Sequence, residues 1–249
     1  MNFFDIIEKT SRDDVFGNEK GFIELYQDYM RVVENKDPEI TKCLKQIAYH
    51  IVNDESNINL YHYARNIDFQ SIMNVIIIYD NITRNSGCSI CLFNTEEYAD
   101  VQGRKINQYI STIDNLKKSA YKNNRMILWD SNSIEFCKSV NSCRGRAISN
   151  LYVYDHKELV HSTSDENNDF VTWINVLGSV GANVRVCGSV IQYNSIFSEL
   201  WHNEEDINNL KFTWKHGPSV DETSMKNMKT LKGKMFDYEY QCKFVEYKG

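Results

Sequence analysis

Short apolar runs alternate along this chain with amphipathic patterns, and this alternation restricts the fold more than any other feature. The runs at 89–93, 151–153 and 183–187 contain the β-branched and aromatic residues that fit buried strands. After the first run, apolar residues recur at helical spacing behind a capping position at Asn94 or Thr95. Strands that alternate with helices favour an α/β domain with a largely parallel sheet, so we predict this fold class.

The N-terminal region predicts helices. Apolar residues recur at helical spacing over 22–33 and again over 40–51, with Pro38 between the two patterns. The run V-I-I-I-Y at 75–79 has strand propensity, but a buried helix would have the same composition.

The second half of the chain contains further elements. Apolar runs at 126–129 and 134–137 predict two short strands that flank a hairpin turn at 130–133. A helical pattern follows at 196–201. The polar composition of 217–229 predicts a linker.

Charge and cysteine content bound the function. A net charge of −6 gives no general basic surface, so any contact with nucleic acid would have to be local. An odd number of cysteines and a start without an apolar leader predict free thiols in a reducing, cytosolic compartment, not secretion. Cys88 and Cys91 form a C-x-x-C pair without a second pair at zinc-finger spacing, so we expect no metal. No apolar run approaches transmembrane length, so we expect no membrane partner.

The stretch 139–156 holds the clearest candidate for chemistry. Its apolar run ends at Asp155, and the carboxyl ends of strands in open α/β sheets border the ligand crevice. Asp155 is therefore a candidate metal-site or phosphate-site residue, although an acid that simply begins a loop gives the same pattern. Cys143, His156 and His161 would also permit a nucleophilic arrangement with Asp155, but the sequence does not fix their geometry.

Several motifs follow one another in the order of one family of motor proteins. The loop S-C-R-G, which contains Arg144 and Gly145, leads into the apolar run 150–155. Later motifs are F-S-E-L-W at 197–201, K-F-T-W-K-H-G-P at 211–218 and F-D-Y-E-Y-Q-C-K-F at 236–244. In this order they resemble the ATPase domain of the large terminase subunit, the DNA-packaging motor of tailed bacteriophages.

The resemblance implies a three-layer, P-loop NTPase-like α/β domain with a mostly parallel central sheet and additional N-terminal helices. It divides the chain into an N-terminal helical segment (1–55), a degenerate ATPase-like core (56–216) and a C-terminal linker or subdomain segment (217–249). It also assigns 75–79 to the helix after the phosphate-binding loop, against the strand propensity of these residues.

The family's phosphate-binding loop, S-R-Q-x-G-K-[ST]-[ST], corresponds to A-R-N-I-D-F-Q-S at 64–71. Arg65 and Ser71 match this pattern. The glycine, the lysine and the magnesium-binding hydroxyl are replaced by Asp68, Phe69 and Gln70. An Asp carboxylate would repel a polyphosphate, and Phe offers neither charge nor donor, so we predict that binding of ATP and magnesium is lost or weak.

Two other family motifs also depart from the pattern. Tyr154 and Asp155, or Asp155 and His156, stand where the family has two adjacent acids, so one acid remains. The coupling motif corresponds to G-S-V-I-Q-Y at 188–193, which lacks the Thr-rich pattern and the P-N-G turn. Loss of ATPase function explains changes at three motifs better than an alignment error at one of them.

The resemblance therefore implies a terminase-like pseudo-ATPase without the nuclease domain, acting as a scaffold or binding module in phage DNA packaging. Its expected partners are packaging proteins or another protein, and a weak DNA contact stays open. The expected location is the cytoplasm of the infected host cell. The alternatives are a divergent active ATPase subunit whose nuclease is a separate polypeptide, and an interaction protein that reuses the fold.

Overall fold

The computed structural model describes residues 18–53, 56–83, 87–113, 120–122, 126–129, 132–139, 147–163, 168–203 and 207–245. The chain forms two compact units. The first unit comprises 1–40, 44–55 and 69–152, and the second comprises 41–43, 56–68 and 153–249.

The first unit contains a mixed sheet. Its strand order is β3-β4-β5-β2-β6, in which β2 and β5 are parallel and the β3–β4 and β4–β5 pairs are antiparallel. The strands are β2 (Cys88–Leu92), β3 (Ala120–Lys122), β4 (Met126–Trp129), β5 (Asn132–Cys137) and the start of β6 (Asn150–Tyr154). The predicted strands at 89–93, 126–129, 134–137 and 151–153 are confirmed, whereas β3 was not predicted. Residues 130 and 131 of the predicted hairpin turn lie outside the described residues.

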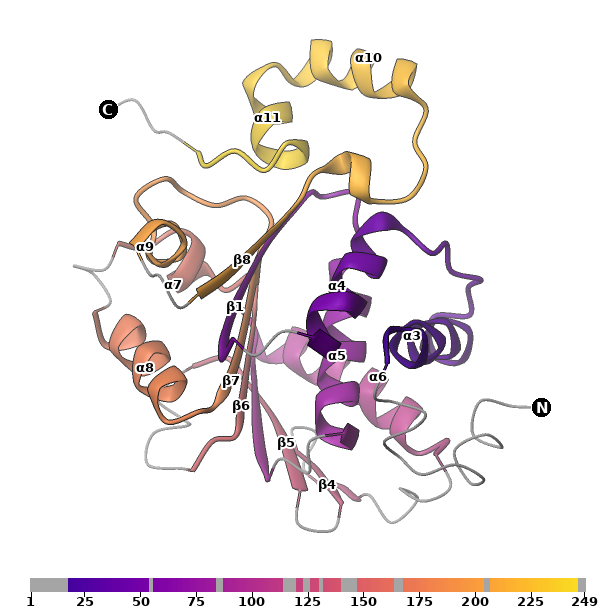
Figure 1. Ribbon diagram of the computed structural model, residues 1–249, viewed down its shortest axis with the longest axis vertical. Coiled ribbons are helices and arrows are strands. Elements are labelled where there is room, and N and C mark those ends of the chain that lie inside the picture. Colours follow the sequence, from indigo (N-terminus) through magenta and orange to yellow (C-terminus); the bar gives the residue numbers. More distant parts are fainter. Residues whose placement is uncertain are drawn as a thin grey trace. The chain divides into compact units, whose positions relative to one another are not determined.

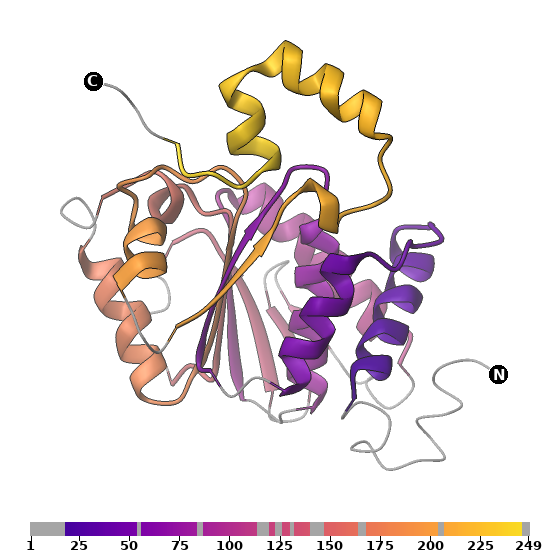
Figure 2. The same ribbon diagram turned by 45° about the horizontal axis from the view of Figure 1, so that its top comes forward.

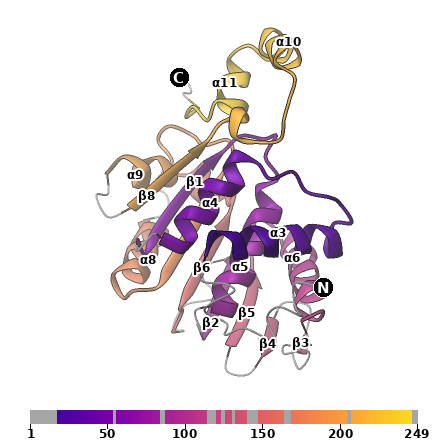
Figure 3. The same ribbon diagram turned by 45° about the vertical axis from the view of Figure 1, so that its right-hand side comes forward.

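Helices α3 (Glu19–Val33), α5 (Phe69–Thr83) and α6 (Glu96–Ile110) pack against one another in the first unit, as Figure 3 shows. Most of α4 (Lys42–Asn53) also belongs to this unit. The two predicted N-terminal helices are confirmed, and so is the helical assignment of 75–79. Every residue from Ser71 to Asn81 is buried, so this apolar stretch is a core helix and not a strand.

Buried polar groups connect α5 with two strands of the first unit. The Tyr152 hydroxyl donates to the Asp80 carboxylate at 3.1 Å. The Ser89 hydroxyl donates to Asn81 at 2.7 Å and accepts from the Asn150 amide at 2.9 Å. Because buried polar groups are costly unless they are paired, these contacts fix how α5 lies on β2 and β6.

The second unit contains parallel strands in the order β7-β1-β8, with the end of β6 beside β7. They are β1 (Ile58–Tyr63), β7 (Asn183–Gly188) and β8 (Ile207–Phe212). The predicted strand at 183–187 is confirmed. Strand β1 was not predicted, because its sequence I-N-L-Y-H-Y interrupts the apolar pattern with Asn59 and His62, although all six residues are buried.

Figure 1 labels the helices of the second unit. They are α7 (Lys157–Val160), α8 (Asn168–Ser179), α9 (Ile196–Asn203), α10 (Glu222–Lys232) and α11 (Lys234–Tyr240). The 3₁₀ turn η3 (Trp214–His216) follows β8. The predicted helix at 196–201 is confirmed as α9. Among the described residues, no helix is long and apolar enough to cross a membrane.

The interpretation of 217–229 as a linker is wrong for most of this stretch, because α10 begins at Glu222. The Asp221 side chain caps α10 by accepting from the Ser224 N–H at 2.8 Å, and a cap of this kind starts a helix in a polar sequence. Gly233, with φ of +53°, makes the sharp turn into α11 that Figure 2 shows in yellow.

Candidate functional site

The loop 64–68 follows β1 in the second unit, where the sequence places a degenerate phosphate-binding loop. Its backbone N–H groups donate to carbonyl oxygens of the protein itself. Ala64 donates to Phe212 at 2.8 Å, Arg65 to Glu239 at 2.9 Å, and Ile67 to Ala64 at 3.0 Å. A phosphate-binding loop works by directing such N–H groups at the ligand, so these three are already used.

The Arg65 side chain has a carboxylate partner in α11. Its Nη1 lies 2.6 Å from Oε1 of Glu239, and Lys232 of α10 pairs with the other carboxylate oxygen. The Glu239 side chain is 6% exposed, whereas that of Arg65 is 52% exposed. The hydrogen bond from Lys232 to Glu239 raises the pKa of that lysine above its usual range. Arg65 thus joins the C-terminal helices to the loop.

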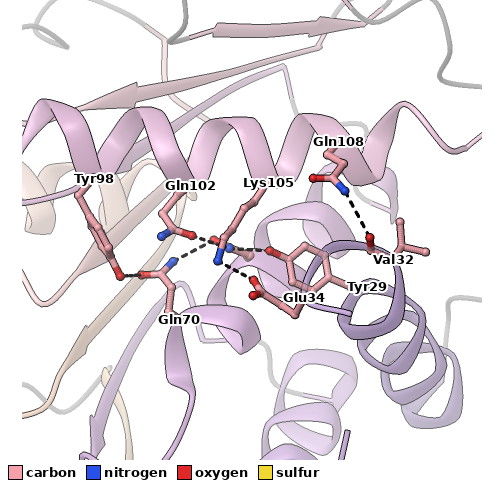
Figure 4. Close-up of polar contacts among 9 residues, drawn as sticks. Tyr29, Val32, Glu34, Gln70, Tyr98, Gln102, Lys105 and Gln108 are labelled. Atoms are coloured by element: carbon pink, nitrogen blue, oxygen red, sulfur yellow. Dashed lines mark hydrogen bonds and ion pairs between the residues drawn. The ribbon is translucent and has the colours of Figure 1, made fainter. Parts of the chain in front are cut away.

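The next three residues start α5 in the first unit. Phe69 and Ser71 are buried, Phe69 completely, and Asp68 before them is exposed. Gln70 enters a polar network between α3, α5 and α6, which Figure 4 shows. The Gln70 amide donates to Asn74 and accepts from the Tyr98 hydroxyl, both at 2.9 Å.

Asn74 stands at the centre of this network. Its amide lies 2.9 Å from the Tyr29 hydroxyl and 2.9 Å from the side-chain oxygen of Gln102. An ion pair between Lys105 and Glu34 at 2.7 Å flanks it. Gln70, which the sequence resemblance aligns with a magnesium-binding hydroxyl, therefore takes part in helix packing.

Asp155 lies directly after β6 in a left-handed backbone conformation, with φ of +44°. One carboxylate oxygen accepts from the Ser189 N–H and the other from the Ser189 hydroxyl, each at 3.1 Å. The Asp155 N–H donates to Cys187 at 2.8 Å. Both oxygens of the remaining acid are thus engaged by Ser189, which follows β7.

Tyr154 stands next to Asp155. Its hydroxyl lies 3.1 Å from that of Tyr63. Burial, and next the proximity of Tyr154, raise the pKa of Tyr63 well above its usual value. A tyrosine held in this way can donate or accept a hydrogen bond, but it cannot act as the second carboxylate of a metal site.

Comparison with known proteins gives a clear result for the fold. No family model and no curated protein matches the chain. Among solved structures, the ATPase domain of the Thermus phage P74-26 large terminase superimposes with a TM-score of 0.61, covering 87% of this chain and 97% of that one at 10% identity. The fold is that of a phage large-terminase ATPase domain.

Two longer terminases give similar matches. The large terminase of a thermophilic bacteriophage, solved in complex with ADP, has a TM-score of 0.60 at 13% identity, and it covers 84% of this chain. The HK97 bacteriophage large terminase has a TM-score of 0.58 at 10% identity and covers 86%. The match spans 54% and 53% of those two proteins. The predicted P-loop NTPase-like fold with a mostly parallel sheet is therefore confirmed.

Arg65 and Asp155 are the two residues of the second unit that the sequence resemblance matches to terminase motifs, and they have different partners. Arg65 pairs with Glu239, whereas Asp155 accepts from Ser189. Sequence reasoning gave Glu239 and Lys232 no role. The only signal for Glu239 was its place in the motif F-D-Y-E-Y-Q-C-K-F, which carries no charge-pair information by itself.

Of the other candidates from the sequence, Cys143, Arg144 and Gly145 lie outside the described residues, and His161 is exposed after α7. His156, from the nucleophilic alternative, is buried, and its ring stacks on Phe170 at 5.9 Å. Within the described part of the chain, no group of three or more His, Cys, Asp or Glu could hold a metal ion.

Proposed function

We propose that this chain is a catalytically inactive, terminase-like protein of phage DNA packaging, in which the motor fold serves as a scaffold or binding module. The observation that carries the proposal is the use of the loop 64–68 by the protein itself. The N–H groups of Ala64 and Arg65 and the Arg65 side chain bind Phe212 and Glu239, both of which belong to the C-terminal part of the chain.

The residues that follow the loop support the same conclusion. Phe69 has no charge for a phosphate and is completely buried, and Gln70 is bound within a helix interface. A nucleotide in the usual P-loop position would need both residues to leave their partners. The exposed Asp68 carboxylate would in addition repel it.

Calorimetric titration with ATP and Mg²⁺ tests the proposal, and the thermophilic phage large terminase solved in complex with ADP is the positive control. We expect no saturable heat and no phosphate release from this chain. Micromolar affinity together with hydrolysis that Arg65→Ala abolishes would overturn the proposal.

A divergent but active ATPase subunit is the second candidate, and the retention of Arg65 and Asp155 favours it. That candidate requires phosphate release that falls when Asp155 is changed to Asn. Equal release from both proteins, at the level of buffer alone, would remove it.

Copurification with packaging proteins from the cytoplasm of infected cells would support the scaffold role, whereas capture of unrelated proteins alone would indicate an interaction protein.

A further inference from the structure

The second unit contains a cavity of about 480 Å³ that is distinct from the loop 64–68. Strand β8, helix α9 and the C-terminal segment contribute its walls. Its positively charged and aromatic lining comes from Tyr193, His202, Lys211, Lys234, Tyr238 and Phe244. Small-molecule sites are commonly cavities of this size with a few convergent polar groups.

The cavity has an excess of positive charge. Lys211 and Lys234 are exposed, and neither forms an ion pair with a carboxylate among the described residues. Lys243 also lines the cavity, but it pairs with Asp237 at 2.7 Å. Lys211 lies close enough to His62 to contribute, after burial, to the lowering of its pKa.

The described lining of the cavity has the opposite charge to the chain as a whole. It contains three lysines and one carboxylate, Asp237, although the net charge of the protein is −6. Local positive charge of this kind attracts anions even to an acidic protein. Lys211 and Lys234 supply point charges suited to a phosphate group.

Aromatic rings form another part of the lining. The ring centroids of His202 and Phe244 are 5.2 Å apart, and those of Tyr193 and His202 are 6.5 Å apart. Tyr193 is 58% exposed, so its ring can accept a flat partner without unfolding of the protein. Planar heterocycles stack on such rings with little dependence on their identity.

We propose that this cavity binds a phosphate group carried beside a planar ring, with Lys211 and Lys234 at the phosphate and Tyr193 and His202 at the ring. A free nucleotide and a nucleotide within a single strand share this chemistry. The proposal is independent of the proposed function, because it uses neither the loop 64–68 nor Asp155.

Calorimetric titration of the full chain with thymidine monophosphate in the absence of Mg²⁺ tests the site. We expect saturable binding, and we expect Lys211→Gln to weaken it about tenfold. Tyr193→Ala should weaken binding of thymidine monophosphate but not of deoxyribose 5-phosphate, which lacks the ring. A short oligothymidylate that binds more tightly than the monophosphate assigns the ligand to a strand, and equal affinity assigns it to the free nucleotide.

Lys229→Gln is the matched control, because it removes the same charge from an exposed helix position outside the cavity. Thermal unfolding of each variant checks that the fold is kept. Equal weakening by Lys211→Gln and Lys229→Gln would show diffuse attraction and overturn the site. Absence of saturable binding of both ligands at millimolar concentration would also overturn it.

Discussion

Residues 64–68 and 69–71 are consecutive, yet different forces hold them. The first stretch is held by backbone hydrogen bonds and by the charged group of Arg65, Glu239 and Lys232. The second is held by the burial of Phe69 and by the uncharged network around Gln70 and Asn74 (Figure 4). Each of these two sets of contacts by itself occupies groups that the P-loop pattern directs at phosphate. A substitution in one stretch would therefore leave the contacts of the other stretch in place.

The largest effect on stability should come from the stretch 69–71, which is held by the burial of Phe69. Phe69→Ala should lower the free energy of unfolding by about 4 kcal/mol, because it removes a completely buried ring and leaves a cavity. Urea denaturation measures the loss. Tyr49→Ala, at a 54% exposed helix position, is the control and should change stability by less than about 0.5 kcal/mol. A loss below about 1 kcal/mol for Phe69→Ala would show that the ring is not what holds this stretch.

The next largest effect should be a pH dependence of the unfolding free energy that comes from His62 in β1, the strand that leads into the loop 64–68. Burial, and next the charge of Lys211, lower the pKa of His62 from 6.5 to about 3. Between pH 6.5 and 3 the unfolded chain therefore binds a proton at this position that the folded chain does not. Stability should fall as the pH falls, by about 2 kcal/mol between pH 7 and pH 5 from this group.

His62→Leu should remove that part of the pH dependence. The comparison uses the slope of unfolding free energy against pH, so an equal change in stability at every pH does not affect it. His50→Leu, in α4, serves as the control for loss of a histidine. Identical slopes for the parent and His62→Leu would contradict the prediction.

A smaller effect on stability is expected from the stretch 64–68, which is held by the charged group of Arg65, Glu239 and Lys232. Glu239→Gln should cost about 1–2 kcal/mol, because it weakens the charge-assisted hydrogen bonds of a buried carboxylate whose partners are partly exposed and screened. The loss should shrink when urea denaturation is repeated at high salt. Asp237→Asn, whose partner Lys243 is 59% exposed, should cost no more than about 0.5 kcal/mol. A salt-independent loss would place the role of Glu239 in packing.

The smallest effect should come from Gln70→Ala, at about 0.5–1 kcal/mol. The variant loses hydrogen bonds to Asn74 and Tyr98, while the good helix propensity of alanine offsets part of the loss. Urea denaturation at two salt concentrations should give the same value, unlike Glu239→Gln. Gln108→Ala, which removes an exposed contact to Val32 in the same helix group, is the control. A loss well above that of Glu239→Gln would reverse the order proposed for the two stretches.

Local pattern was sufficient for most elements. The strands at 89–93, 151–153 and 183–187 have continuous apolar sequences and are confirmed as β2, β6 and β7. The resemblance to the terminase family assigned 75–79 to a helix against its strand propensity, and α5 confirms it. Strand β1 was missed because tertiary burial covers its polar residues too, and α10 because a single capping Asp starts it within a polar stretch.

The α/β class, the strands with continuous apolar sequences and the presence of Phe69 where the family pattern has a lysine could be read from the sequence, because each of these depends on residue types at near spacing. The partners of Arg65 and Asp155, in contrast, depend on tertiary packing. Arg65 and Glu239 are 174 residues apart, and Asp155 and Ser189 are 34 apart. Hydrogen-bonded pairs at such separations leave no periodic signal along the chain. They form because packing brings the groups together and buries the acceptor, as the 6% exposure of the Glu239 side chain shows.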